Sequence, residues 1–295
     1  MNSHLNTNPH LFLSASPLKT TRCFLEIHEM SNLRKFLFFA SAISIMSQAC
    51  YAQITTSIQP GNVLNIGYGF DSTKPATGMQ SFKTQWRFLT LDPSPSGTRF
   101  LATQFWLDPV DHSGGGDTLY IGINPPNQAI NYAGQVHFSY FGAKGGTLYN
   151  QNCHAGADGG GGITCALDSV KALPGQTYRF EAKITKATAT ATTLEGNVQV
   201  FDTYGNMIDS QQIGSFDVLR TNMELTYPGS WVEGTSDPCS SLTRTMVEYS
   251  PFWRNGNIDA ADAVNLNSIS GKCPFTYSVY TFSDGTQSVR IQYGN

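Results

Sequence analysis

An acidic, glycine-rich segment contains the first residues in this sequence that could do chemistry. Asp108, Asp111 and Asp117 follow Trp106 at short spacing, and a run of glycines separates the last two acids. Calcium binds several carboxylate and carbonyl oxygens at adaptable geometry, so this spacing predicts a Ca²⁺ site on a loop. In lectin-like proteins such a loop often also orders a sugar site. The alternative is a solvated hairpin whose acids cap turns.

A second loop lies between Cys153 and Cys165 and consists mostly of glycine and small residues, with His154 and Asp158 among them. Glycines let backbone amides approach a ligand closely, which makes Asp158 a candidate ligand-binding residue. A disulfide across a loop of this length stabilises the fold by about 3 kcal/mol in the chain-entropy model. The alternative is a stapled loop at the edge of a sheet.

Aromatic residues make up 12% of the chain, enough to supply a platform on which sugar rings stack. Aromatic side chains mostly bury large apolar areas in a core, and that is the competing interpretation for Trp86 and Trp106. Trp231 and Trp253 lie in sequence contexts that resemble loops, so their side chains are as readily exposed as buried.

Common enzyme signatures are missing from the sequence, including the Gly-x-Ser-x-Gly elbow, His-Glu-x-x-His and the phosphate loop. The Glu-x-Asp-x-x-Glu strand motif of sandwich-fold glucanases does not occur either. Glycosidases need two carboxylates within about 5–10 Å of each other. Carboxylates distant in sequence can converge, so a polysaccharide hydrolase or lyase stays an alternative to a binding protein.

Residues Met30 to Ala52 have the organisation of a secretory signal peptide. Arg34 and Lys35 precede the apolar run 36–46, and small residues lead to a cleavage site after Ala52. The run is too short for an ordinary transmembrane helix. The alternative is a lipoprotein acylated at Cys50. Residues 1–29 show no pattern, which indicates a start codon assigned upstream of Met30 or a disordered extension. We predict a secreted or periplasmic protein.

Four cysteines follow the leader: Cys153, Cys165, Cys239 and Cys273. They allow three pairings. The pairs 153–165 and 239–273 are favoured, because the first is local and the second brackets one C-terminal segment. Charged residues are only 13% of the chain and the formal net charge is −3. With no basic run, the composition argues against a nucleic-acid partner.

Alternation of apolar and polar residues predicts an all-β protein. In Tyr178–Thr185, Tyr178, Phe180, Ala182 and Ile184 share one face, which is typical of a strand with one buried side. Shorter patterns predict strands at 118–124 and 135–140, and 99–107 is apolar on both faces at its end. Turn pairs such as Pro228-Gly229 separate the strands.

The fold class predicted from this pattern is an antiparallel β-sandwich of jelly-roll or concanavalin-like type with very little helix. Only Asp259–Asn265 looks helical. We expect one domain over residues 53–295, with a small disulfide-bonded C-terminal lobe from residue 229 as the alternative.

The order of several segments resembles a family of secreted bacterial proteins of unknown function. Gln104-Phe105-Trp106 is followed by a glycine loop and by Tyr120-Ile121-Gly122-Ile123-Asn124, then by Val136-His-Phe-Ser-Tyr140, the cysteine loop and Pro174-Gly-Gln-Thr-Tyr-Arg-Phe180. The resemblance covers Arg99 to Cys239 and implies secretion and a jelly-roll or concanavalin-type sandwich. This sequence differs at Asn124, where the family tends to have Gln, and at Tyr140, where it tends to have Trp. The family supplies no catalytic residues.

Together these features favour a secreted, lectin-like, non-catalytic glycan-binding protein, and a structural or host-interacting surface protein is the third hypothesis. The predicted ligand-binding residues are Trp106, Asp108, Asp117, Tyr120, His137 and Asp158. The predicted calcium ligands are Asp108, Asp111 and Asp117.

Overall fold

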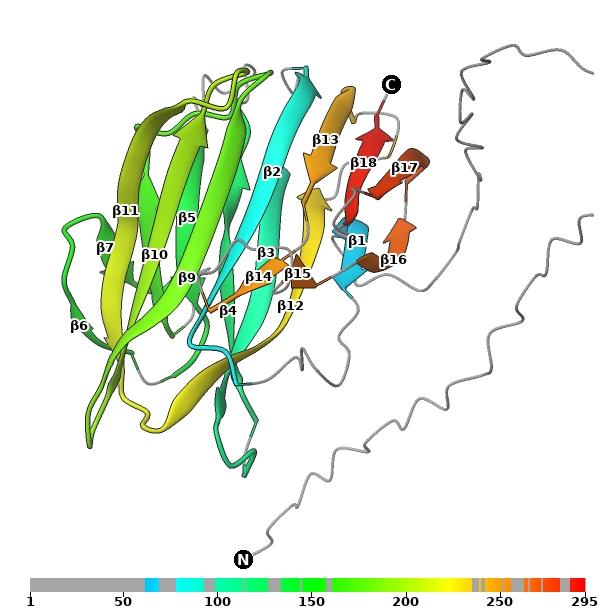
Figure 1. Cartoon of the computed structure of the whole chain (residues 1–295). Coiled ribbons are helices and arrows are strands. Elements are labelled where there is room, and N and C mark those ends of the chain that lie inside the picture. Colours follow the sequence, from blue (N-terminus) through cyan, green and yellow to red (C-terminus); the bar gives the residue numbers. More distant parts are fainter. Residues whose placement is uncertain are drawn as a thin grey trace, which may run out of the picture. The chain divides into compact units, whose positions relative to one another are not determined.

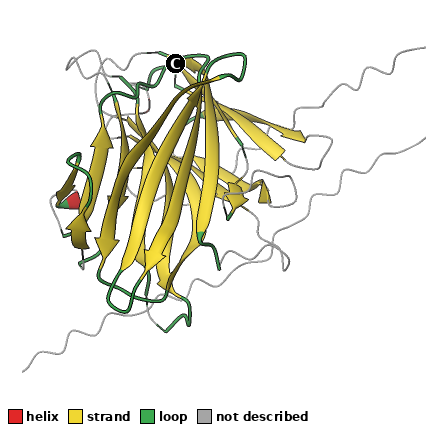
Figure 2. Cartoon of the chain, turned by 60° about the vertical axis from the view of Figure 1, so that its left-hand side comes forward, coloured by secondary structure: helices red, strands yellow, loops and turns green. Residues whose placement is uncertain are grey.

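The computed structural model describes residues 62–68, 78–92, 99–113, 115–126, 134–143, 145–157, 161–234, 239, 242–250, 252–255, 263–264, 266–271, 273–281 and 287–294. The signal segment, the N-terminal extension, Cys50 and Asp158 lie outside these ranges. The described residues form two antiparallel sheets packed face to face (Figures 1 and 2). This confirms the predicted all-β sandwich.

The first sheet has eight strands, in the spatial order β16 (Leu266–Gly271), β1 (Asn62–Tyr68), β12 (Met223–Gly234), β3 (Arg99–Pro109), β4 (Asp117–Asn124), β5 (Gln135–Tyr140), β8 (Ile163–Leu167) and β7 (Cys153–Ala155). The central strands β12, β3, β4 and β5 pair with continuous antiparallel register, apart from a bulge in β12 between Thr226 and Gly229. The candidate site lies on this sheet.

The second sheet has ten strands. Eight lie in a row: β17 (Phe275–Thr281), β18 (Gln287–Tyr293), β13 (Thr245–Tyr249), β2 (Ser81–Leu91), β9 (Thr177–Ala187), β10 (Thr192–Phe201), β11 (Met207–Val218) and β6 (Gly145–Leu148). Two short strands stand beside this row, because β14 (Phe252–Arg254) pairs with β2 and β15 (Ala263–Val264) pairs with β14.

The core between the sheets is strongly aromatic. Phe82 on β2 lies edge-on to Phe105 on β3, with ring centroids 4.5 Å apart, and Phe138 on β5 contacts Phe216 on β11 at 5.2 Å. Each pair joins one sheet to the other. Alternation along β2 as far as Phe88, and along the whole of β10, buries every second side chain, since successive residues of a strand face opposite sides of its sheet. Trp86 is fully buried in this core, which confirms the core interpretation of this residue.

Both favoured cysteine pairs form disulfides, Cys153–Cys165 and Cys239–Cys273. Disulfides are typical of proteins that mature in an oxidising compartment. In the described part of the chain no helix is long and apolar enough to cross a membrane.

Two local predictions were wrong. Pro228-Gly229 is not a turn but lies inside β12, because a register shift between Thr226 and Gly229 accommodates the proline within the strand. Ala263 and Val264, predicted to be helical, form β15 against β14. Asp259–Asp262 lie outside the described residues.

Candidate functional site

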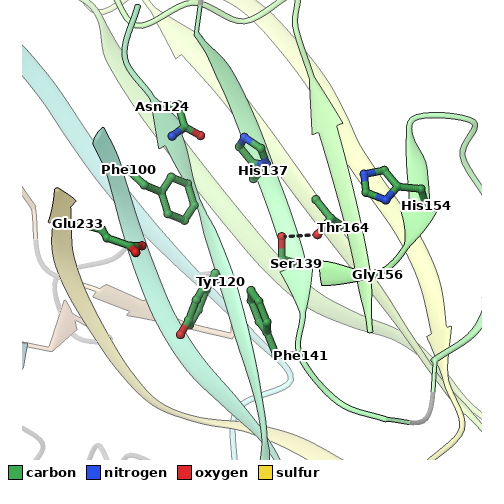
Figure 3. A pocket seen from close by; sticks show the side chains of 10 residues that line it. All are labelled: Phe100, Tyr120, Asn124, His137, Ser139, Phe141, His154, Gly156, Thr164 and Glu233. Atoms are coloured by element: carbon green, nitrogen blue, oxygen red, sulfur yellow. Dashed lines mark hydrogen bonds between the residues drawn. The ribbon is translucent and has the colours of Figure 1, made fainter. Parts of the chain in front are cut away.

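A hollow of about 450 Å³ lies on the open face of the eight-stranded sheet (Figure 3). This face points away from the second sheet and therefore from the core. The hollow extends across the sheet from β12 to β7. Its described lining residues are Phe100, Tyr120, Asn124, His137, Ser139, Phe141, His154, Gly156, Thr164 and Glu233.

Small side chains explain why the sheet is hollow at this place. Ala102, Gly122, His137 and Ala166 lie directly beside one another on β3, β4, β5 and β8. Three of these four positions have a methyl group or no side chain. A Cβ atom added at Gly122 would come within 2.2 Å of the carbonyl oxygen of Leu101 and 2.9 Å of the Phe100 ring. Gly122 therefore lets the Phe100 ring lie close over the strand.

Aromatic rings form one side of the hollow. The Tyr120 ring contacts Trp231 edge-on at 4.6 Å and Phe141 at 4.5 Å between centroids. Trp231 lies on β12 and is buried, so the loop-like context assigned to it from sequence was misleading. Tyr120 itself is half-buried. This cluster holds the Tyr120 ring in one place at the surface, where a ligand can stack on it or beside it.

His137 occupies the floor of the hollow. Its ring lies edge-on to Phe100, with centroids 5.6 Å apart. Burial lowers the pKa of His137 to about 4, with Asp168 opposing the shift and His154 adding to it. The imidazole is therefore neutral at pH 7. Its Nε2 atom is buried and has no hydrogen-bond partner, an arrangement that disfavours adding a charge to the ring.

Hydroxyl, amide and carboxylate groups line the rest of the hollow. Ser139 and Thr164 share a hydrogen bond of 3.1 Å between their hydroxyl oxygens, drawn as the dashed line in Figure 3. Asn124 and the exposed carboxylate of Glu233 lie toward one end, and the exposed His154 lies on the far side on β7. The site thus combines a rigid aromatic side with several hydrogen-bonding groups.

The Cys153–Cys165 disulfide supports the β7 side of the hollow. The two cysteines are directly paired across β7 and β8, with 3.9 Å between Cα atoms. Their side chains face the second sheet, where Gly214 of β11 leaves room for them. A Cβ atom at Gly214 would lie 2.3 Å from the Cys165 sulfur. The disulfide therefore holds β7, including the backbone of His154, against β8.

The predicted ligand-binding residues divide into two groups. Tyr120 and His137 both line the hollow. Trp106 is half-buried on the same open face, between its cross-strand partners Thr118 and Thr226. It lies two residues along β3 from Gln104, the partner of Tyr120. Asp158 lies outside the described residues, although its neighbour Gly156 is part of the lining.

The three acids of the glycine-rich segment have separate partners. Asp108 accepts a hydrogen bond from Thr226 on the open face. Asp117 belongs to the opposite, inward face, where it accepts from Tyr140 and from Arg220, each at 2.7 Å. The exposed Asp111 accepts from the Ser113 hydroxyl at 2.7 Å, which lowers the pKa of Asp111.

No group of three His, Cys, Asp or Glu side chains placed to hold a metal occurs among the residues described. The calcium hypothesis stays a prediction, and the separate hydrogen bonds of Asp108, Asp111 and Asp117 give it no support.

Glu224, which is far from Asp108 in the sequence, lies directly beside it in the sheet. Glu224 on β12 is the cross-strand partner of Asp108, and 6% of its side chain is exposed. One oxygen of Glu224 lacks a hydrogen bond and lies 4.0 Å from the Nε2 atom of His112. Opposed residues in an antiparallel pair have Cβ atoms about 4.5–5.5 Å apart, so the two carboxyl groups are near neighbours.

Sequence reasoning missed most of the lining, including Phe100, Phe141, Ser139, Thr164 and Glu233. One signal was present, since 99–107 is apolar on both faces at its end although an antiparallel sandwich strand needs only one buried face. At that end the outward apolar residue is Trp106, which lies on the same side of β3 as Phe100. The other missing residues come from strands far apart in the chain.

No protein-family model and no curated protein matches this sequence. Among solved structures, it is similar to the kappa-carrageenase from Pseudoalteromonas carrageenovora in complex with an oligotetrasaccharide of kappa-carrageenan. The identity is 8% and the TM-score 0.25, over 74% of this chain and 65% of that one.

A second similar structure is a 1,3-alpha-1,4-beta-D-galactose-4-sulfate-3,6-anhydro-D-galactose 4 galactohydrolase. The identity is 7% and the TM-score 0.24, over 74% of this chain and 64% of that one. The matched part is thus just under two thirds of the length of both proteins. Similarity this low carries no argument about activity.

Proposed function

We propose that this is a secreted protein that binds an extended glycan chain in the hollow on its eight-stranded sheet, without cleaving it. The observation that carries the proposal is the aromatic cluster around Tyr120 beside a row of hydrogen-bonding groups. Sugar rings offer apolar C–H faces and polar hydroxyl edges. An aromatic side chain accommodates the face, and Asn124, Ser139, Thr164 and Glu233 can bond to the edges.

The extent of the hollow favours a chain over a single sugar. Its lining runs from Glu233 on β12 to His154 on β7, across β3, β4, β5 and β8. With neighbouring strands about 4.8 Å apart, these six strands span roughly 24 Å. A glycan lying across the strands would therefore contact the protein through several sugar units.

The lining also favours binding over hydrolysis. Glycosidases use two carboxyl groups on either side of the scissile bond. Among the described residues of the hollow, Glu233 contributes the one carboxylate. The half-buried His137 is neutral at pH 7, and its imidazole can bond to a sugar hydroxyl at the floor.

Affinity electrophoresis against a panel of soluble polysaccharides tests the proposal, using residues 53–295 expressed with both disulfides formed. We expect at least one polysaccharide to retard the protein. The variant Tyr120→Ala should weaken that binding about tenfold or more, equivalent to about 1.4 kcal/mol.

The control variant is Gln199→Ala, an outward-facing residue of the other sheet, which should bind as the wild type does. Parallel gels with added calcium and with a chelator test the calcium hypothesis. If no polysaccharide retards the protein under either condition, the proposed function is wrong.

A polysaccharide-cleaving enzyme, hydrolase or lyase, is the second candidate, and the Asp108–Glu224 pair favours the hydrolase. The two carboxylates oppose each other on the open face, next to Trp106. Release of reducing ends from the retarded polysaccharide, abolished in Glu224→Gln and in Asp108→Asn, would establish hydrolysis. Unsaturated products that absorb in the ultraviolet would indicate a lyase instead. Intact polysaccharide after prolonged incubation would exclude both.

A further inference from the structure

A second polar feature of the open face lies outside the hollow, toward the end of β3. Asp108 on β3 and Glu224 on β12 are cross-strand partners, and the side chain of Glu224 is only 6% exposed. One Glu224 oxygen is buried and accepts no hydrogen bond. The Nε2 atom of His112 lies 4.0 Å from that oxygen, which is too far for a hydrogen bond. A buried carboxylate in this state is costly unless a positive group compensates it.

Asp108 adds a second carboxylate and brings no compensating charge. It accepts a hydrogen bond from the neutral hydroxyl of Thr226. Neither carboxylate has a further hydrogen bond or ion pair with any residue that the structure describes. Two adjacent negative charges repel each other, so the pair favours a ligand that brings a positive charge.

Trp106 provides an aromatic ring next to this carboxylate pair. It is the preceding outward residue of β3 and is half-buried, with Thr118 and Thr226 as its cross-strand partners. Diagonal neighbours on paired strands are within reach of aromatic and long side chains, which places Glu224 within reach of the Trp106 ring. The face of an aromatic ring accommodates a sugar ring and also attracts a cation.

Gly116 makes room for the Asp108 carboxylate. A Cβ atom added at Gly116 would collide with Oδ1 of Asp108 and lie 2.8 Å from its carboxyl carbon. It would also lie 3.2 Å from the Cβ atom of Trp106. The neighbouring Gly115 has open space around the same position. The position of the Asp108 carboxylate beside Glu224 therefore depends on a glycine at 116 and not at 115.

We infer that Trp106, Asp108 and Glu224 form a subsite for an amino sugar, with the sugar ring against Trp106 and its ammonium between the two carboxylates. An ammonium donates three hydrogen bonds, and its bonds to carboxylates are charge-assisted and therefore strong. The His112 side chain is 57% exposed, so it can move aside without disturbing the core.

The ligand class is a glycan with free primary amines, such as partly N-deacetylated chitin. The cation subsite is argued from its own contacts. The choice of a sugar over another amine rests on the proposed function, since the subsite and the hollow share one open face.

The experiment compares glycol chitosan, which carries free amines, with glycol chitin, its N-acetylated form. Surface plasmon resonance at pH 6 measures both affinities, with a chelator present so that calcium cannot bridge protein and glycan. The two polysaccharides share a backbone, so the ratio of their affinities isolates the effect of the amine. We expect the wild-type protein to bind glycol chitosan at least about tenfold more tightly.

Charge-removing variants locate that preference. Glu224→Gln and Asp108→Asn should each reduce the affinity ratio to about threefold or less. The matched control is Glu181→Gln on β9. It removes the same charge on the outer face of the other sheet, where Glu181 faces Lys83 at 3.5 Å, and should keep the wild-type ratio.

A pair of glycine variants separates the position of the carboxylate from the net charge. Gly116→Ala displaces the Asp108 carboxylate and leaves the net charge unchanged, so it should lower the affinity ratio about threefold or more. Gly115→Ala makes the same chemical change in the same hairpin and should keep the ratio.

The possible outcomes separate this inference from the proposed function. A wild-type ratio near one would overturn the inference, and the glycan site in the hollow would stand if Tyr120→Ala still weakens polysaccharide binding. A high ratio retained in Glu224→Gln and Gly116→Ala would mean that net charge alone acts, which also overturns the inference.

Two further outcomes concern the ligand. If poly-L-lysine displaces glycol chitosan as well as free glycol chitosan does, at equal amine concentration, the assignment to an amino sugar is wrong. Binding of glycol chitosan that depends on Glu224 but not on Tyr120, with no binding of any uncharged polysaccharide, would support the amino-sugar subsite and overturn the glycan site in the hollow.

Discussion

The two open faces of the sandwich follow the same alternation of side chains but differ in chemistry. On the ten-stranded sheet the outward residues form a series of ion pairs. Lys83 faces Glu181 at 3.5 Å, and Lys183 faces Glu195 at 2.7 Å. Arg179 lies over the Phe201 ring, 4.6 Å from its centroid. Long charged side chains keep this face hydrated, and the hollow that they line there is smaller, about 230 Å³.

On the eight-stranded sheet the corresponding positions carry alanine, glycine, aromatic rings and the half-buried His137. In the row Ala102, Gly122, His137 and Ala166, three of the four residues are alanine or glycine, so the surface is hollow at its centre. An open face with exposed aromatic rings lacks the solubility that paired charges provide. Because the sheet does not need such a face in order to fold, exposed apolar surface of this kind suggests a binding role. In the proposed function, the open face of the ten-stranded sheet faces solvent and that of the eight-stranded sheet binds the glycan.

The largest expected effects concern the two disulfides. Replacing Cys239 and Cys273 by serine should lower the free energy of unfolding by about 4 kcal/mol, and replacing Cys153 and Cys165 by about 3 kcal/mol, because the first pair closes the longer loop. Only the second double variant should also weaken glycan binding, since β7 supports the hollow. Denaturant unfolding and affinity electrophoresis measure the two quantities.

If both double variants lose the same affinity, the hollow does not depend on its own staple. The proposed role of β7 in supporting the ligand-binding face would then be wrong.

The pH dependence of stability tests the buried state of His137. The folded protein holds the pKa of His137 at about 4, against 6.5 for the unfolded chain. Between these values the unfolded chain binds a proton that the folded protein does not. Stability should therefore fall as the pH drops from 6.5 to 4, by up to about 3 kcal/mol at roughly 1.4 kcal/mol per pH unit.

His137→Gln should flatten this part of the profile, measured by urea unfolding at several pH values. Asp168 and His154, which also interact with the imidazole, stay unchanged in that variant. A profile that keeps its slope between pH 6.5 and 4 in His137→Gln would show that His137 is hydrated and that another group causes the pH dependence.

Local pattern was enough to predict most of the fold. The alternation in Tyr178–Thr185 and Gln135–Tyr140 predicted β9 and β5, since each strand buries one face independently of its neighbours. The prediction failed at Pro228, because the bulge that accommodates the proline depends on pairing with β3. It failed at Ala263–Val264 because pairing with β14 outweighs local helical pattern.

The candidate site was predictable only in part, for a related reason. Tyr120 and His137 were predicted as ligand-binding residues. Both line the hollow, and they belong to the neighbouring strands β4 and β5. Glu233 is adjacent to Phe100 through the β12–β3 register, which joins residues far apart in sequence. Asp108 and Asp117, close in sequence, point to opposite faces of the sheet because strand alternation separates them. Spacing along the chain therefore predicted a cluster of Asp108 and Asp117 that does not form. It also missed the neighbouring positions of Phe100 and Glu233.

The smallest expected effect comes from the ion pairs on the solvent face. Burial raises the pKa of Glu195, but hydrogen bonds from Lys183 and Asn197 outweigh it and leave the pKa below its usual value. The contribution of this carboxylate to stability is therefore present at neutral pH and is lost as the pH falls through its folded pKa. Because both side chains are partly exposed, Lys183→Met should lower the free energy of unfolding by no more than about 1 kcal/mol at pH 7.

The same variant should bind glycan with unchanged affinity, because Lys183 lies on the sheet opposite the hollow. Urea unfolding and affinity electrophoresis on one protein preparation measure both effects. High salt should reduce the stability difference, since salt screens exposed charges. A loss of glycan affinity in Lys183→Met, with the fold intact, would place a binding surface on the ten-stranded sheet and overturn the contrast between the two faces.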